Sequence, residues 1–595
     1  MTAPCDAVVS ENRPGRLLAK WSGELTIGVV AGVSFLAVWP LGEYAILDDW
    51  AFVKSLQHLH ERGELVVLDW NPMSLTGHLL WGLLFTKCLG FSFFVTKLSA
   101  FVAGVILVLI VYWMCRRMHV SVGLSLTAAL GLWLNPLFLP HCFMYMTDVT
   151  SLLWQWLSVV CLLQGLSGEN RRARTFLVAG SGLWALAFLT RQHGIVVPLA
   201  FVAWLFLFHR ARFWSHVPLY ACLPGAWLAM NGLLWHRMNQ AFNTSSDLVW
   251  EFLSDPPWSE LPYIFFSYAV YIGLFALPVM ASVRWSDLRR LSGRRMALVA
   301  AAIWLGVFLF VQYSMRGLSF PYIRNVVTNW GLFQPHEFVV GDRLRLWDPG
   351  WGITVGASGI VAALSLLAAV LAVRSSSETT STPSGSVPSP PWMPFLLLLF
   401  VAQIGYVMAT SPILYDRHLL LLAPTVLILA ASHVRRCRPM AAVALLIGYG
   451  AYGIVGTHDI HAVSRVVFLE GERLLASGIP SRHVDAGYAF DGWHMYEESQ
   501  AVQPAPAIRL PPWWPSDRKT ASTDLRQPWW IYHLVTTIQP DYVVGVSAGL
   551  PSRMFPGADP FQRQPAKTSF RTFWPWRRQS VFVFQRHSTP ERPSP

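Results

Sequence analysis

The chain has 595 residues, of which 54% are hydrophobic and only 13% are Asp, Glu, Lys or Arg, about half the charged fraction of an ordinary soluble domain. With a mean hydropathy of +0.41, this composition excludes a soluble globular protein and predicts a membrane protein. The net charge of +12 comes from Arg clusters between apolar runs, a pattern that reports membrane topology and argues against a nucleic-acid partner. The seven Cys residues are scattered without a CxxC pair and indicate neither a disulfide framework nor a zinc site.

Apolar segments of about 20 residues recur along most of the chain. The first begins near Leu25 after a short basic stretch and has no small-residue cleavage site, so we interpret it as a retained signal anchor. Hydropathy predicts about thirteen membrane spans. They lie near residues 25–42, 92–114, 121–139, 149–167, 175–190, 193–208, 217–235, 263–283, 296–314, 351–373, 392–410, 413–432 and 440–457.

The basic residues assign the gaps between these spans to the two sides of the membrane. Every even-numbered gap carries Arg, as Arg116 and Arg117 do in the first of them, and short cytoplasmic loops are the loops that collect Arg and Lys. The odd-numbered gaps are longer and richer in carboxylates and aromatics. These predicted outside loops are 43–91, 140–148, 236–262 and 315–350. The pattern predicts a cytoplasmic N-terminus and an extracytoplasmic C-terminus.

Two segments differ in character from the apolar core. Residues 375–391 are rich in Ser, Thr and Pro and predict a disordered cytoplasmic linker. Residues 458–595 mix helix-like segments with strand-like ones, such as 484–490, and contain turn-forming Pro and Gly, which predicts a small extracytoplasmic α/β domain. The predicted fold is therefore mainly α: a cytoplasmic tail over 1–24, a polytopic transmembrane domain over 25–457, and the α/β domain.

Two adjacent carboxylates, Asp48 and Asp49, stand where the first span leaves the membrane. Charge at such a place is costly unless it is solvated or used. One interpretation is that Asp48 only caps a short interfacial helix that starts near Trp50. Because adjacent residues do not share a helix face, the other interpretation is a split pair. One carboxylate then points into a cavity and the other caps or orients.

The predicted topology brings further charged residues to the same membrane face. Asp148 lies at the outside mouth of the fourth span, and the cations at outside span ends are Arg191, His193, Arg417 and His418. Carboxylates that take protons and cations that hold a phosphate, at one interface, are typical of an active site. The alternatives are an N-capping Asp148, an Arg191 that snorkels from a span end, and an Arg417 that pairs with its neighbour Asp416.

Several short motifs together resemble the GT-C glycosyltransferases. They are the carboxylate pair that closes the first span, Met146-Thr147-Asp148, Leu189-Thr190-Arg191-Gln192 before Val197-Pro198, and Asp416-Arg417-His418-Leu419-Leu420 before Pro424. The predicted spans with an outside C-terminal domain are similar to the lipid A aminoarabinose transferase. The loop motifs resemble bacterial relatives of protein O-mannosyltransferases. The resemblance covers the whole chain in layout and about five short patches in sequence.

The resemblance implies transfer of a sugar, a hexose or a pentose, from a polyprenyl-phosphate donor to an acceptor hydroxyl outside the cytoplasm. The host would be a bacterium, the location its plasma (inner) membrane, and the tail periplasmic. By carry-over Asp48 is the general base, Asp148 orients the acceptor, and the choice between Asp48 and Asp49 stays open. Arg191 and Arg417, with His418 and Arg324, would hold the donor phosphate. Asp48 and Asp148 would be the ligands if a divalent cation takes part, and His141 is a further candidate. Relatives tend to have Asp-Glu where this chain has Asp48-Asp49, which leaves metal use open.

The remaining candidates are residues for the acceptor or the sugar. They are Tyr145, His193, Trp330, Asp491, Trp493 and His494. An aromatic platform beside amide and guanidinium donors suits a sugar ring and a phosphate, which fits the loop with Arg324 and Trp330. The alternative for the loop is an interfacial aromatic belt, and for residues 485–494 it is a plain strand and turn. The acceptor itself, whether protein, lipid or glycan, is not encoded in any motif.

A transporter or flippase of a lipid-linked or anionic solute is the rival class, since thirteen spans also fit a carrier. Against it, the candidate residues gather at one face of the membrane rather than at its middle, and the two halves show no repeat. A non-catalytic scaffold is the third class. An Asp48→Asn variant separates the transferase from the other two classes, because it keeps the size of the side chain but removes the catalytic base.

Overall fold

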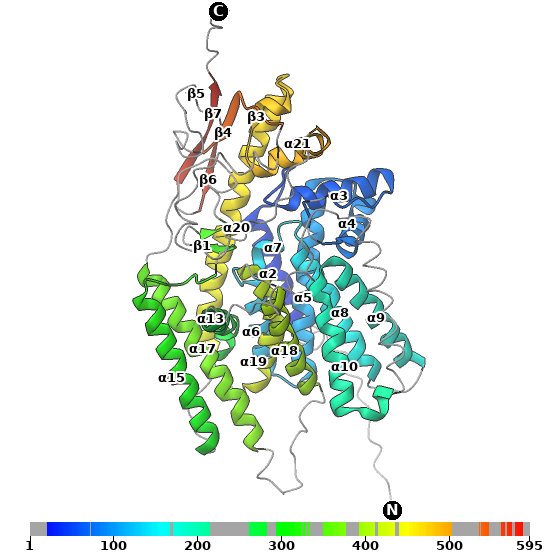
Figure 1. The fold of residues 1–595 in the computed structure, drawn as a ribbon, viewed down its shortest axis with the longest axis vertical. Coiled ribbons are helices and arrows are strands. Elements are labelled where there is room, and N and C mark those ends of the chain that lie inside the picture. The colour runs from blue at the N-terminus through cyan, green and yellow to red at the C-terminus, as the bar shows by residue number, and fades with distance from the viewer. Residues whose placement is uncertain are drawn as a thin grey trace, which may run out of the picture.

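The computed structural model is mainly helical, and its helices form an elongated bundle (Figure 1). The structure describes residues 21–68, 70–71, 73–166, 171–214, 261–281, 293–323, 325–328, 331–333, 349–376, 392–410, 415–434, 439–502, 535, 537–546, 561–565, 568–573 and 577–586. The predicted span 217–235 and linker 375–391 therefore lie outside the described residues, apart from the end of one helix that runs to Ser376.

The helices follow one another along the chain with short connections. In the first part they are α2 (Ser22–Val38), α3 (Asp49–Arg62), α4 (Thr76–Leu89), α5 (Phe93–Arg117), α6 (Val122–Trp133), α7 (Phe138–His141), α8 (Thr147–Leu166), α9 (Arg171–Thr190), the 3-10 turn η1 (Gln192–Ile195) and α10 (Val196–Phe208). In the second part they are α13 (Leu261–Met280), α15 (Gly293–Met315), α17 (Pro349–Ser376), α18 (Met393–Thr410), η2 (Asp416–Leu421), α19 (Ala423–His433), α20 (Pro439–Ala476), η3 (Ser481–His483) and α21 (Tyr488–Val502).

Seven of the described helices are long and apolar enough to cross a membrane, and five shorter apolar helices accompany them. These twelve coincide with twelve of the predicted spans, and the thirteenth falls on residues 217–235, so the full count stays a prediction. One boundary differs from the prediction. The last span was expected to end at 457, whereas α20 continues without a break to Ala476. Hydropathy reports only the apolar part of a helix, so it misses a continuation that packs on protein.

Local sequence explains how these helices start and how closely they approach. α5 begins after Ser92, whose side chain accepts a hydrogen bond from the backbone N–H of Val95 at 3.1 Å. α8 and α9 pack side by side at Gly180, where a Cβ atom would lie 2.9 Å from Leu162. The hydroxyl of Ser158 donates to the Gly180 carbonyl oxygen at 2.7 Å. Small residues that let helix backbones approach, with a polar contact between them, are typical of membrane helix pairs.

The non-spanning elements gather at one end of the bundle (Figure 1). α3, α4 and the hairpin of β1 (Val327–Thr328) and β2 (Gly331–Leu332) lie there below α21. The strands of the tail are β3 (Val484–Asp485), β4 (Tyr542–Gly545), β5 (Phe561–Arg563), β6 (Thr568–Thr572) and β7 (Arg577–Arg586). β3 pairs parallel with β4, and β7 pairs antiparallel with β4, β5 and β6.

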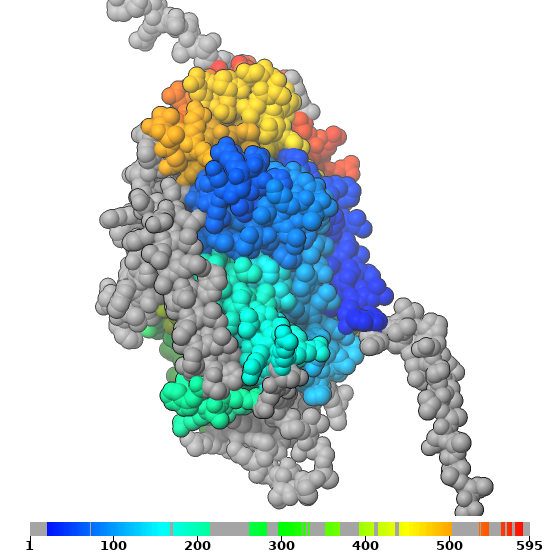
Figure 2. Space-filling model, turned by 90° about the vertical axis from the view of Figure 1, so that its right-hand side faces the viewer, coloured from blue at the N-terminus to red at the C-terminus, as the bar shows by residue number. Residues whose placement is uncertain are grey.

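The tail packs directly on the first loop between spans. Figure 2 shows α20 and α21, in yellow and orange, lying over the blue surface of α3 and α4, and α21 contacts α3. The segment 484–490 was expected to be strand-like, but only its first two residues are a strand. Gly487, at φ +83°, turns the chain so that α21 begins at Tyr488. Whether the tail is a separate domain stays a prediction.

Candidate functional site

The two adjacent carboxylates of the first loop point to different surroundings. Asp49 is fully buried, and its Oδ1 accepts a hydrogen bond from the backbone N–H of Ile46 at 2.6 Å. The Asp49 N–H donates back to the Ile46 carbonyl oxygen at 3.1 Å. Burial raises the pKa of Asp49 to about 7, because a low-dielectric surrounding disfavours the charged form. Asp49 therefore holds the turn that precedes α3.

Asp48 is the carboxylate of this pair that remains accessible, with 27% of its side chain exposed. Its Oδ1 accepts hydrogen bonds from the Tyr488 hydroxyl at 2.5 Å and from the Trp70 indole N–H at 3.4 Å. Its Oδ2 lies 3.7 Å from a guanidinium nitrogen of Arg417. Asp48 occupies the N-cap position of α3, but its side chain makes no capping hydrogen bond. The carboxylate is thus directed away from its own helix.

Backbone strain lies beside Asp48. Leu47 has φ +53°, the left-handed region that a branched side chain adopts only at a cost. The side chain of Leu47 is nevertheless buried. The reciprocal hydrogen bonds between Ile46 and Asp49 close the turn around it. The strained turn aims Asp48 out of the helix while its neighbour points inward.

A second carboxylate sits at the start of α8 within a cation cluster. Asp148 is nearly buried, and its Oδ1 accepts a hydrogen bond from Arg191 at 2.8 Å. The same guanidinium nitrogen donates to the Thr147 hydroxyl at 3.1 Å. The charge of Arg417 interacts with the carboxylates of both Asp148 and Asp48. Two carboxylates and two guanidinium groups therefore form one electrostatic cluster.

Arg417 owes its place to η2 and to the backbone of another loop. The carboxylate of the preceding residue, Asp416, is fully buried and accepts hydrogen bonds from the N–H groups of Val326 and Val327 at 2.9 and 2.7 Å. Among the described residues Arg417 forms its ion pair with Asp48, and the charge of Asp416 also acts on it. The Nε atom of Arg417 is buried without a hydrogen-bond partner in the described part of the chain.

The histidines near the cluster are held by the protein. His193 Nδ1 accepts from the Gln155 side-chain amide at 2.9 Å, and His141 Nδ1 donates to the Leu137 carbonyl oxygen at 2.7 Å. His141 and His418 both lie within electrostatic reach of Asp148. Each ring is therefore oriented from a short helix or turn at the same end of the bundle.

Other predicted residues lie in packing positions. Tyr145 is fully buried, stacks on His78 with ring centroids 3.9 Å apart, and donates to the His78 carbonyl oxygen at 3.1 Å. The ring of Trp493 packs on Phe93 with ring centroids 4.7 Å apart, and Nζ of Lys54 lies 4.2 Å from the centroid of the Trp493 ring. Their described contacts belong to the packing of helices, not to the cluster.

The remaining tail candidates also contact protein groups. Asp491 is fully buried, and its Oδ1 accepts from the backbone N–H of Ala486 at 3.2 Å. Burial, together with the nearby Asp485 carboxylate, raises the pKa of Asp491 well above its usual range. His494 pairs with Glu472 at 2.7 Å. Asp491 thus caps the turn before α21, and His494 ties α21 to α20.

Two further predictions concern a pair of loop residues and a metal site. Arg324 and Trp330 lie outside the described residues. Asp48 and Asp148, the carboxylates expected as metal ligands, each contact an arginine. Within the described ranges no three His, Cys, Asp or Glu side chains are placed to hold a metal ion. No step below uses a metal.

The sequence analysis did not single out Tyr488 or Trp70, the two side chains that donate to Asp48. Tyr488 lies 440 residues from Asp48 along the chain, so no spacing pattern could connect them. The signal in the sequence was the segment 485–494, which contains Tyr488 and was singled out for Asp491, Trp493 and His494.

Part of the chain matches a family of known proteins. Residues 78–235 match the dolichyl-phosphate-mannose-protein mannosyltransferase family, a segment that includes Asp148 and Arg191 but not Asp48 or Arg417. No curated protein matches significantly.

Two solved structures of ArnT from Cupriavidus metallidurans resemble the chain. The apo form is 12% identical, with 95% of this chain and 98% of that chain covered and a TM-score of 0.40. The form bound to undecaprenyl phosphate is 14% identical, with 94% and 98% covered and the same TM-score. The resemblance of this multi-pass membrane chain to the GT-C glycosyltransferases is confirmed, with the family match over residues 78–235 as its sequence signature.

Proposed function

We propose that the chain is an inverting glycosyltransferase of the plasma membrane that uses a polyprenyl-phosphate sugar as donor. The acceptor is a hydroxyl on the extracytoplasmic face, the N-terminus is cytoplasmic, and the tail is extracytoplasmic. The observation that carries the proposal is the pairing of a partly exposed carboxylate, Asp48, with Arg417 in one cluster with Asp148 and Arg191. The family match over residues 78–235 supports the reaction class.

The geometry supports a division of the chemistry among these side chains. Oδ2 of Asp48 takes the proton of the acceptor hydroxyl while that oxygen attacks the anomeric carbon. The bond from that carbon to the phosphate oxygen breaks on the opposite face of the sugar, which inverts the configuration. The phosphate leaves with the bonding electrons, and Arg417 and Arg191 hold its charge.

The same geometry supports Asp48, rather than its carboxylate neighbours, as the base. Asp49 has no exposed surface and holds a backbone N–H, so it cannot approach an acceptor hydroxyl without breaking the turn. Asp148 is bound by Arg191, and its part is to orient that guanidinium and, beside it, the acceptor. Asp48 is the member of the three with substantial exposure.

The test is release of polyprenyl phosphate and transfer of labelled sugar by the purified full-length chain, with short-chain mannose, glucose and arabinose donors. Asp48→Asn should abolish turnover and keep donor binding, whereas the matched variant Asp49→Asn should retain turnover. Arg417→Gln should weaken donor binding. Equal turnover by Asp48→Asn and the parent would refute the proposal. Donor binding without release from any donor would favour the rival transporter or flippase.

A further inference from the structure

We propose that Tyr488, from the extracytoplasmic tail, is the positioning residue that holds Asp48 for catalysis, so that docking of α21 completes the active site. The inference rests on the glycosyl transfer proposed above and adds a requirement to it. Tyr488 does not touch substrate. It acts through Asp48, whose Oδ1 accepts the Tyr488 hydroxyl at 2.5 Å.

The hydrogen bond fixes which oxygen of Asp48 is available. Tyr488 and Trp70 both donate to Oδ1, and Oδ2 is left facing Arg417 at 3.7 Å. A carboxylate held by one oxygen presents the other in a defined direction, as a general base requires. Burial and the Asp48 carboxylate raise the pKa of Tyr488 well above its usual range, so the hydroxyl keeps its proton and stays a donor.

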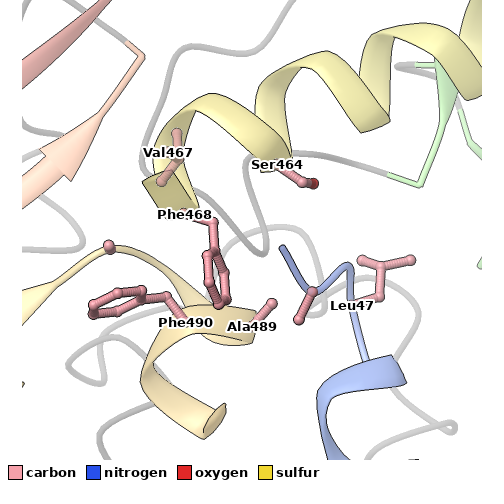
Figure 3. Close-up of a pocket in the computed structure, with 8 residues that line it drawn as sticks. Leu47, Ser464, Val467, Phe468, Ala489 and Phe490 are labelled. Carbon is pink, nitrogen blue, oxygen red and sulfur yellow. The ribbon is translucent and has the colours of Figure 1, made fainter. Parts of the chain in front are cut away.

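α21 is a rigid support for this hydroxyl. Figure 3 shows Ala489 and Phe490 of α21 with Phe468 of α20 and Leu47 around one small apolar pocket. The helix also approaches closely at Gly492, where a Cβ would lie 2.4 Å from the Trp50 ring. Packed contacts on both sides therefore fix the residue that carries the donor.

The strained turn explains why Asp48 needs an external hold. Leu47 has φ +53°, a conformation that persists only when its surroundings impose it. A hydrogen bond from a helix that is remote in sequence keeps Asp48 extended toward Arg417, and loss of that bond frees the carboxylate to rotate.

The experiment compares Tyr488→Phe with the matched control Tyr496→Phe. Tyr496 lies on the same helix and packs on Trp50 with ring centroids 5.2 Å apart. The control should keep the parent turnover. Tyr488→Phe should lower kcat by about 10- to 100-fold, the equivalent of a lost hydrogen bond to a charged group, with the donor KM within about twofold because the phosphate is held by other residues.

The pH profile supplies a readout that a general loss of structure would not give. Charged or titratable groups that act on Asp48 are Arg417, Arg191, Asp49 and Tyr488. Without the Tyr488 donor, the ionised form of the carboxylate loses a stabilising contact. The acid limb of the kcat profile should then move to higher pH in Tyr488→Phe and stay in place in Tyr496→Phe.

A double-mutant cycle measured by thermal unfolding tests the proposal without any need for turnover. Tyr488→Phe should lower the unfolding temperature in the parent but not in an Asp48→Ala background, because the bond is then already absent. If the parent releases no polyprenyl phosphate from any donor, the proposed function fails, and the cycle still decides whether the contact exists. If the parent turns over and Tyr488→Phe matches it in kcat and pH profile, the positioning role is refuted and the function stands. Additive shifts in the cycle would also refute it.

Discussion

Replacing Asp148 with Asn tests whether the buried ion pair organises the cation cluster. The Asp148 and Arg191 side chains are 5% and 12% exposed, and their charged atoms lie 2.8 Å apart. Coulomb's law with an effective dielectric constant of about 20 gives roughly 6 kcal/mol for two unit charges at this separation. Desolvation offsets part of this energy, and removing one partner of such a pair typically costs about 3–5 kcal/mol. The oxygen of the introduced Asn side chain still accepts a hydrogen bond from Arg191. We therefore expect the free energy of unfolding to fall by about 3 kcal/mol.

The assay is thermal unfolding of the purified protein in detergent, followed by tryptophan fluorescence. Glu497→Gln is the matched control, because Glu497 is 42% exposed and pairs with His58 and Lys54 at the surface. A surface pair contributes about 0–1 kcal/mol, so Asp148→Asn should shift the midpoint several times further.

Asp148→Asn carries a second expected effect, of opposite sign. It leaves Arg191 and Arg417 with one carboxylate fewer, so polyprenyl phosphate should stabilise the variant more than the parent. Equal midpoints for Asp148→Asn and Glu497→Gln would refute the energetic argument. A smaller stabilisation by the lipid phosphate than in the parent would refute the electrostatic one.

Three further variants test single contacts. Asp49 has a pKa of about 7 in the folded state, above the ordinary 3.8. Between these two values the folded state binds a proton that the unfolded state has lost, so stability falls as the pH rises from 3.8 to about 7. Asp49→Asn should flatten this dependence in melting curves measured from about pH 4 to 8. Gly492→Ala places a Cβ 2.4 Å from the Trp50 ring and should cost about 1–3 kcal/mol, with a fall in kcat if α21 is displaced. Asp416→Asn removes one of the two carboxylate oxygens that accept the backbone N–H groups of Val326 and Val327. The variant should lose about 1–3 kcal/mol of stability, and the amide that loses its acceptor should exchange its hydrogen faster.

The sequence predicted the arrangement of spans better than their ends. Long apolar runs must form helices in a bilayer, and twelve of the predicted spans coincide with apolar helices. The end of α20 at Ala476 was not predictable in this way. After about residue 457 the helix packs on protein, and its contacts with Phe490 and Ala486 at Gly471 come from a segment that hydropathy does not connect to it.

The site was predictable only as far as membrane topology reaches. Topology placed Asp48, Asp148 and the arginines at one face, and the structure brings them into one cluster. Which of Asp48 and Asp49 faces the cluster depends on the φ of Leu47, a backbone choice that the residue type disfavours. The donor from Tyr488 comes from 440 residues away. Tertiary packing decides both, so no local pattern reveals them.

The two carboxylate–arginine contacts differ in a way that matters for the proposed reaction. Asp148 and Arg191 are joined by a hydrogen bond of 2.8 Å, whereas Asp48 and Arg417 lie 3.7 Å apart and are more exposed. An incoming phosphate can therefore compete for Arg417 more easily than for Arg191. Because the phosphate draws Arg417 to itself, Oδ2 of Asp48 loses its cation at the stage when the acceptor hydroxyl needs a base. On this argument donor binding precedes proton transfer, and initial-rate kinetics should show ordered addition with the lipid donor first.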